Sequence, residues 1–261
     1  MRAYLRIMTG SIYTDVSAYV RWGFVPALLI IGSSIGAAKA DEKLAVARQN
    51  MIRVIELHAR IDADIVDRVA IGEAVLDAMA EVPRHEFVAE NFRSAAYEDR
   101  PLPIGHGQTI SQPFIVALMT EMLELEPDDV VLEIGTGSGY QAAILAELVR
   151  EVHTIEIIPA LAETAAAALE KLAYDNVRTY VGDGYFGVTE AAPFDGIMVT
   201  AAASHVPPPL IEQLKPGAKM IIPVGSSFAF QYLMMVEKDA DGRVTTSQTL
   251  PVSFVPLTRG E

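Results

Sequence analysis

The feature that most constrains the fold is a turn with glycine at every second position from Gly135 to Gly139. The preceding segment, Val130–Ile134, has the length and β-branched composition of a buried strand, and the apolar spacing predicts a helix over Tyr140–Arg150. Glycine permits a tight turn between them and lets a ligand approach the backbone, because no Cβ intervenes. A helix N-terminus favours a carboxylate or phosphate. The pattern therefore predicts a ligand-binding strand–turn–helix unit.

Alternation of strands and helices continues after this unit and predicts the fold class. Further strands are expected at Val152–Ile157, Val177–Val181, Phe194–Thr200 and Lys219–Val224, with helices at Pro159–Ala173 and Pro209–Leu214. The last two segments, Phe230–Val236 and Val244–Val255, have no helix between them and predict an antiparallel hairpin. We therefore expect an α/β, doubly wound, mostly parallel sheet with helices on both faces and a C-terminal antiparallel hairpin.

The region before the sheet is predicted to be helical, with one long loop. Helical spacing of apolar residues predicts helices over Asp41–Arg60, Asp62–Met79 and Pro113–Glu124. Residues 83–112 are rich in proline, glycine and polar residues, which favours a loop. A loop of this length inside a compact domain is usually functional or disordered.

The first forty residues differ from the rest of the chain. Three arginines precede a mostly apolar run, Trp22–Ala38, and Ala38-Lys39-Ala40 has the small-x-small pattern of a signal-peptidase site. This favours an export signal. Two alternatives are a retained membrane anchor, since about 17 residues is near the lower limit for spanning, and a true start further downstream. We expect a leader over 1–40 and a single domain over 41–261, with 41–126 on the substrate side and 127–261 forming the cofactor-binding sheet.

Composition excludes several classes of function. The formal net charge is −14, and an acidic surface repels a phosphate backbone, so we expect no nucleic-acid partner. The chain has no cysteine, which excludes a thiol nucleophile, a disulfide and a cysteine-ligated metal. Its five histidines lack metal-ligand spacing, so no metal site is expected.

Three acidic residues fall where a nucleotide-like ligand would meet a parallel sheet. Glu133 stands beside the glycines, where it would repel a pyrophosphate but attract an amino group or a sulfonium. Glu156 ends the second strand, about 20 residues after the glycines, where a carboxylate can accept hydrogen bonds from both ribose hydroxyls. Asp183, between Gly182 and Gly184, can accept a hydrogen bond from an exocyclic amine. Alternatives are a solvated strand-end charge for Glu156 and an ordinary turn for Asp183.

Ser111 lies where the long loop meets the helix beginning at Pro113. One interpretation makes it the N-cap of that helix, with proline in the first turn. Another places its hydroxyl at a reacting group, where it orients an incoming carboxylate. The two interpretations are compatible. His106, between Gly105 and Gly107 in the same loop, is a candidate for substrate contact.

Four stretches together resemble the protein-L-isoaspartate O-methyltransferase family, which belongs to the class I S-adenosylmethionine-dependent methyltransferases. They are Val82–Val88, Pro101–Pro113, Val131–Ala142 and Phe254–Thr258, and the similarity runs from about residue 50 to the C-terminus. The segment Gly107–Ser111 is more specific to the family than the glycine turn. Ser204-His205 departs from the Pro-Glu frequent at that position, and the leader is unusual.

The resemblance implies roles for individual residues. They are Ser111 as the active-site serine, Gly135, Gly137 and Gly139 as the cofactor loop, Glu156 as the ribose acid, Asp183 and Gly184 at the adenine, and Thr258 near the cofactor. It also implies a class I methyltransferase fold with S-adenosylmethionine as cofactor, methyl transfer to the α-carboxylate of isoaspartyl residues in damaged proteins, and a cytoplasmic location. We separately expect a monomer.

Two alternatives to this function remain open at the level of sequence. A class I methyltransferase for another protein or a small molecule would share the glycines and the acids, so only the Ser111 segment separates the two. The other alternative is a non-catalytic exported homologue that keeps the fold. Its activity would be lost because export removes a protein from the cytosolic supply of the cofactor. The leader predicts export to the periplasm, and any membrane contact would run through it alone.

Overall fold

A computed structural model describes residues 26–61, 70–226 and 230–260. The chain divides into two compact units, Met1–Lys43 and Leu44–Glu261, and the second holds the sheet and the candidate site. In the first unit the described backbone is helical from Pro26 onward. Much of the predicted leader, including Arg2, Arg6 and Arg21, lies outside the described residues.

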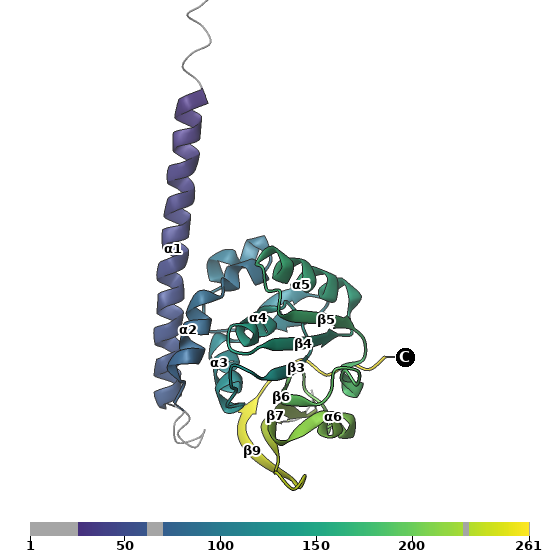
Figure 1. Ribbon diagram of the computed structural model, residues 1–261. Helices are drawn as coiled ribbons and strands as arrows, with labels where there is room; N and C mark the ends of the chain where they lie inside the picture. The colour runs from purple at the N-terminus through teal and green to yellow at the C-terminus, as the bar shows by residue number, and fades with distance from the viewer. Residues whose placement is uncertain (1–25, 62–69, 227–229, 261) are drawn as a thin grey trace, which may run out of the picture. The chain divides into compact units, whose positions relative to one another are not determined.

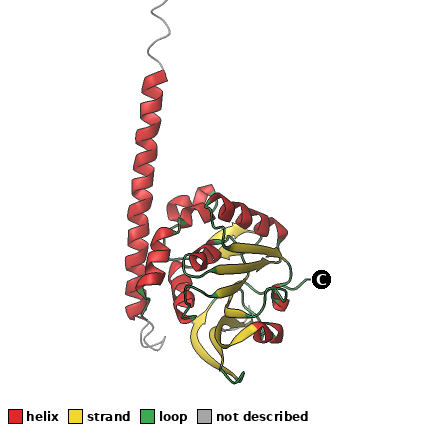
Figure 2. Ribbon diagram, viewed as in Figure 1, coloured by secondary structure: helices red, strands yellow, loops and turns green. Residues whose placement is uncertain are grey.

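A seven-stranded mixed sheet forms the centre of the second unit (Figure 2). The strand order is β5-β4-β3-β6-β7-β8-β9, with β3 to β7 parallel and β8 and β9 antiparallel at one edge. The strands are β3 Val130–Ile134, β4 Glu151–Glu156, β5 Val177–Val181, β6 Phe194–Val199, β7 Leu214–Gly225, β8 Gln231–Lys238 and β9 Val244–Val252. The predicted fold class and C-terminal hairpin are confirmed.

The two faces of the sheet bury separate apolar cores because successive strand residues point to opposite sides. Val131 and Met198 pack into the larger core, together with residues of α1, α2, α3 and α4. Leu132 and Ile197 pack into the other, together with Leu210 of α6. Helices therefore cover both faces, as expected for a doubly wound sheet (Figure 1).

The helices follow the predicted order with shifted ends. They are α1 Pro26–Ile61, α2 Glu73–Glu81, α3 Pro113–Met122, α4 Tyr140–Ala146, α5 Pro159–Lys171 and α6 Pro208–Gln213. The helix expected from Asp41 begins earlier, and the one expected over Asp62–Met79 is observed only from Glu73, with 62–69 outside the described residues. Within the described part of the chain, no helix is long and apolar enough to span a membrane.

The prediction of a continuous loop over residues 83–112 is wrong. This stretch contains two short 3-10 helices, η3 Arg84–Phe87 and η4 Glu90–Ala95, and a hairpin of β1 Leu102–Gly105 and β2 Gln108–Ile110. The glycines that suggested a loop close this hairpin, since Gly105, His106 and Gly107 all have positive φ. The hairpin leads directly into Ser111 and α3.

Candidate active site

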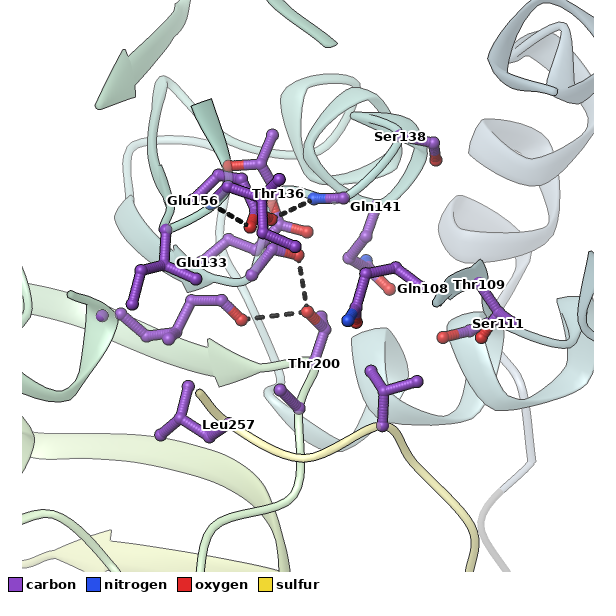
Figure 3. Close-up of a pocket in the computed structure, with 18 of the residues that line it drawn as sticks. Gln108, Thr109, Ser111, Glu133, Thr136, Ser138, Gln141, Glu156, Thr200 and Leu257 are labelled. Carbon is purple, nitrogen blue, oxygen red and sulfur yellow. Dashed lines mark hydrogen bonds between the residues drawn. The ribbon is translucent and has the colours of Figure 1, made fainter. Parts of the chain in front are cut away.

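A pocket lies at the carboxyl ends of β3, β4 and β6, where parallel sheets usually bind their ligands (Figure 3). Its wall includes the β2–α3 connection, the glycine turn, the ends of β4 and β6, Gly184, and the C-terminal segment Val255–Thr258. The sites predicted around Ser111, Glu133, Glu156 and Thr258 thus meet in one pocket.

The glycine turn has a backbone conformation that residues with a side chain rarely adopt. Gly135, Gly137 and Gly139 have φ of +96°, +54° and +87°. A Cβ at Gly135 would lie 2.6 Å from Thr200 Oγ1, which itself donates a hydrogen bond to the Gly135 carbonyl at 2.7 Å. Gly139 is the N-cap residue of α4. The turn needs glycine for both its backbone angles and its close packing.

Glu156 ends β4 and holds the glycine turn in place. One carboxylate oxygen accepts the Gly137 N–H at 2.9 Å, and the other accepts the Ile158 N–H at 2.9 Å. The residue is largely buried and lines the pocket. Each carboxylate oxygen has a second lone pair, so hydrogen bonds to a ligand remain possible.

Glu133 lines the same pocket but is fully buried. Its Oε2 accepts a hydrogen bond from Thr154 Oγ1 at 2.5 Å, whereas Oε1 has no hydrogen-bond partner among the described residues. Burial, opposed in part by the Thr154 hydrogen bond, raises the pKa of this carboxyl to about 8. Glu133 therefore holds a proton at neutral pH and has one oxygen available for a ligand.

The two residues expected at an adenine base are placed differently. Gly184 lines the pocket, and a Cβ there would lie 2.4 Å from Ile134 Cγ2. Asp183 stands beside the pocket lining: its Oδ1 accepts the Tyr185 N–H at 3.0 Å, and its Oδ2 accepts from Arg259 Nε at 2.9 Å. Burial alone would raise the Asp183 pKa, but these hydrogen bonds lower it below its usual value. The ion pair with Arg259 is a contact that sequence order could not indicate.

The structure corrects the capping role predicted for Ser111. The N-cap residue of α3 is Gln112, whose side chain makes no capping hydrogen bond. The Phe114 N–H instead donates to Asp99 Oδ1 at 2.9 Å. Pro113 has no N–H to offer, which leaves a cap at position 111 one donor fewer. Ser111 lines the pocket, and its role at a reacting group stays a prediction.

The histidines take places away from the pocket lining. His106 is exposed at the tip of the β1–β2 hairpin. His153 lies in β4 against Tyr180, His85 packs on Tyr97, and His205 contacts the Tyr185 hydroxyl at 3.3 Å. His58 carried no signal in the sequence, yet its Nδ1 lies 2.7 Å from Asp99 Oδ2.

A second cavity adjoins the pocket. Both cavities are lined by Thr109, Ser111, Thr200 and Val255, and the second extends over Pro101, Gln112, Ile115 and the segment 251–254. Figure 3 shows Thr200 between the buried acids and the strand that leads to Ser111. The residues that line the second cavity are all uncharged. Thr200 was not singled out from the sequence, because only the sheet brings the end of β6 to the glycine turn.

Comparisons with known proteins agree with this geometry. Residues 57–261 match the family described as protein-L-isoaspartate(D-aspartate) O-methyltransferase. The chain is 60% identical to protein-L-isoaspartate O-methyltransferase 2 of Syntrophobacter fumaroxidans, with coverage of 88% of this chain and 92% of the relative. It is 59% identical to protein-L-isoaspartate O-methyltransferase 1 of Cupriavidus necator, with coverage of 84% of each.

Two solved structures are similar over most of the chain. One, named a protein-L-isoaspartate O-methyltransferase, has a TM-score of 0.71 at 29% identity, covering 80% of this chain and 65% of that one. The other, a Plasmodium falciparum protein described by the same activity and solved in complex with S-adenosyl-L-homocysteine, has a TM-score of 0.67 at 25% identity. The match covers 83% of this chain and 98% of that one.

Proposed function

The chain belongs to the protein-L-isoaspartate O-methyltransferase family, and from that membership we propose which of its residues carry out the reaction. The enzyme moves a methyl group from S-adenosylmethionine to isoaspartyl residues of damaged proteins, which is a repair reaction. The observation that carries the residue assignment is the meeting of Ser111, the glycine turn and Glu156 around one pocket.

The pocket has the chemistry that the cofactor requires. Glu156 would accept hydrogen bonds from the ribose hydroxyls, the backbone from Gly135 to Gly139 would lie against the ligand, and Gly184 would leave room for the base. The free oxygen of Glu133 can accept a hydrogen bond from an amino group. When bound there, the cofactor supplies an electrophilic methyl group on its sulfonium.

Asp183 and two outer residues complete the assignment. Within the described residues, Oδ1 of Asp183 accepts a hydrogen bond only from the Tyr185 N–H, so a lone pair remains for the exocyclic amine of adenine. Thr258 lines the pocket and would lie against the cofactor. His106, on the hairpin that leads to Ser111, would contact the substrate outside the pocket.

The substrate carboxylate would be held at Ser111. A carboxylate is ionised at neutral pH, so the reaction needs no strong general base. Catalysis then comes mainly from holding the oxygen, methyl carbon and sulfur in line. The second cavity would take the residues that flank the isoaspartate, and its uncharged lining avoids repelling the reacting carboxylate.

Residues 1–40 are proposed to lie outside the catalytic fold. The family match starts at residue 57, and the compact unit that contains the site starts at Leu44. A cytoplasmic location would give the enzyme access to its cofactor, whereas a cleaved leader would export it. Fractionation of cells, with immunodetection of the chain, distinguishes the two, and the mass of the purified protein in solution tests the expected monomer.

The role of Ser111 is tested with Ser111→Asp and Ser111→Ala. The aspartate adds a negative charge beside the substrate carboxylate, so we expect methyl transfer to fall at least about 100-fold, equivalent to about 2.7 kcal/mol. Alanine should lower turnover less, because it removes the orienting hydroxyl without adding charge. Cofactor affinity by titration calorimetry should stay within a few-fold of wild type.

The matched control is Ser247→Asp, which adds the same charge on an exposed position of β9. It should leave transfer unchanged. If Ser111→Asp methylated an isoaspartyl peptide at the wild-type rate, Ser111 would have no part in holding the carboxylate. The activity of Ser111→Asp therefore also distinguishes the assigned enzyme from a methyltransferase that places its substrate elsewhere.

A further inference from the structure

The connection between β2 and α3, residues Ser111–Phe114, is held by two buried side chains of opposite charge. Both come from the part of the chain between α2 and β1, more than ten residues earlier. One is Arg84, in η3, and the other is Asp99, which follows η4. Each contacts a different part of the connection.

Arg84 holds the Ser111 end. Its side chain is fully buried, its Nη2 donates to the Ser111 carbonyl at 2.7 Å, and its Nε donates to the Ala96 carbonyl at 2.7 Å. Burial lowers the Arg84 pKa to about 10, so the group stays positively charged at neutral pH. A charge-assisted hydrogen bond from a buried cation is stronger than one between neutral groups.

The same guanidinium also reaches the cofactor side of the pocket. It lies over the ring of Tyr140, with 4.8 Å between the guanidinium carbon and the ring centroid. Tyr140 is the first residue of α4, follows Gly139 directly and lines the pocket. Arg84 is therefore in contact with both the Ser111 segment and the residue after the glycine turn.

Asp99 holds the other end of the connection. Its Oδ1 accepts the Phe114 N–H at 2.9 Å, and its Oδ2 accepts from Gln112 Nε2 at 3.0 Å. Only 8% of its side chain is exposed, and His58 Nδ1 lies 2.7 Å from Oδ2. Asp99 thus supplies the cap that α3 does not receive from its own sequence.

We propose that Arg84 and Asp99 are positioning residues for methyl transfer, because together they fix the backbone of Ser111–Phe114 relative to the glycine turn. This inference rests on the proposed role of Ser111. Neither side chain lines the pocket, so each acts through the segment that it holds. A misplacement of about 1 Å can reduce the rate of an oriented reaction about 100-fold.

The test uses Arg84→Lys, Asp99→Asn and Asp99→Ala. Lysine keeps the charge but loses the planar fork that donates to two carbonyls. Asparagine keeps one acceptor for the Phe114 N–H, and alanine removes both. For each variant, kcat and KM are measured with an isoaspartyl peptide, cofactor Kd by calorimetry, and stability in urea, at a temperature where the variant is folded.

Two matched controls carry the same chemistry elsewhere in the unit. Arg48→Met removes a guanidinium that donates to the carbonyls of Ala80 and Glu81 at 2.8 and 3.1 Å. Asp195→Asn changes a carboxylate that accepts the Val130 N–H at 2.9 Å and binds Lys215. Both should lower stability while leaving kcat per folded molecule at the wild-type value.

We expect kcat to fall about 10-fold in Arg84→Lys and in Asp99→Asn, and more in Asp99→Ala, with cofactor Kd changed less than about 3-fold. Amide hydrogen exchange at Phe114 should become faster in both Asp99 variants. Wild-type kcat in these variants, or an equal loss in the controls, would overturn the proposal.

A wild-type enzyme that failed to methylate the peptide would instead refute the proposed function. In that case hydrogen exchange still tests whether Arg84 and Asp99 fix the backbone of Ser111–Phe114. Faster exchange over residues 111–114 in the Asp99 variants, but not in Arg48→Met, supports it. Unchanged exchange overturns it.

Discussion

Replacing Gly135 by alanine should destabilise the protein through two separable effects. The residue has φ of +96°, and holding an alanine there costs about 1–2 kcal/mol. The new Cβ would also lie 2.6 Å from Thr200 Oγ1, and overpacking of this kind costs about 1–3 kcal/mol. The two together predict a loss of about 2–5 kcal/mol in the free energy of unfolding.

Urea denaturation followed by circular dichroism measures this loss. Gly217→Ala is the matched control, because Gly217 has φ of +86° and no described atom within 4 Å of an added Cβ. The control should lose only the backbone part, about 1–2 kcal/mol. The difference between the two variants is then the contribution of the clash with Thr200.

A double variant isolates the clash. Thr200→Ala removes the oxygen nearest the new Cβ, and the next atoms of Thr200 lie at 3.9 and 4.0 Å, which is ordinary contact. In the Thr200→Ala background, Gly135→Ala should therefore cost no more than Gly217→Ala does in wild type, a coupling of about 1–3 kcal/mol. If Gly135→Ala were no more destabilising than Gly217→Ala in wild type, the packing argument would be wrong.

Three further predictions concern the pocket and the N-terminus. The Glu133 pKa is raised to about 8 in the folded chain from 4.5, so the stability that its proton contributes below pH 4.5 is lost as the pH rises to about 8. Glu133→Gln should lack that loss and gain on wild type by a few kcal/mol between pH 5 and 8.5 in urea titrations, because one pKa unit corresponds to about 1.4 kcal/mol; parallel curves would refute the buried proton. Glu156→Ala should weaken cofactor binding by roughly 1–3 kcal/mol in calorimetry, and unchanged affinity would remove Glu156 from the ribose site. A chain that begins at Asp41 should fold and keep its transfer activity; an inactive product would make residues 1–40 structural.

The sheet could be predicted because its signals are local. Val130–Ile134 is a short, mostly apolar run and Val177–Val181 is rich in β-branched and aromatic residues; turn residues bound both, and the structure has them with the predicted bounds. The glycine turn could be placed for the same reason, since its position after a strand already restricts the backbone. Pocket residues at these strand ends follow from the topology of a parallel sheet.

The contacts around Ser111 could not be predicted because they join distant segments. Sequence spacing suggested that Ser111 caps its own helix, but the cap comes from Asp99, which follows η4. Arg84 gave no sign of burial in the sequence, since arginine ordinarily lies at the surface. The pairing of Asp183 with Arg259 likewise depends on where the C-terminus returns.

Methyl transfer to a matched pair of peptides tests the central claim most directly. One peptide carries a single L-isoaspartyl residue, and its twin carries L-aspartate at the same position. With S-adenosylmethionine labelled in the methyl group, the enzyme should form a base-labile methyl ester on the isoaspartyl peptide, and the aspartyl twin should remain unlabelled. Equal labelling of both peptides, or no labelling by folded protein that binds the cofactor, would contradict the assigned function.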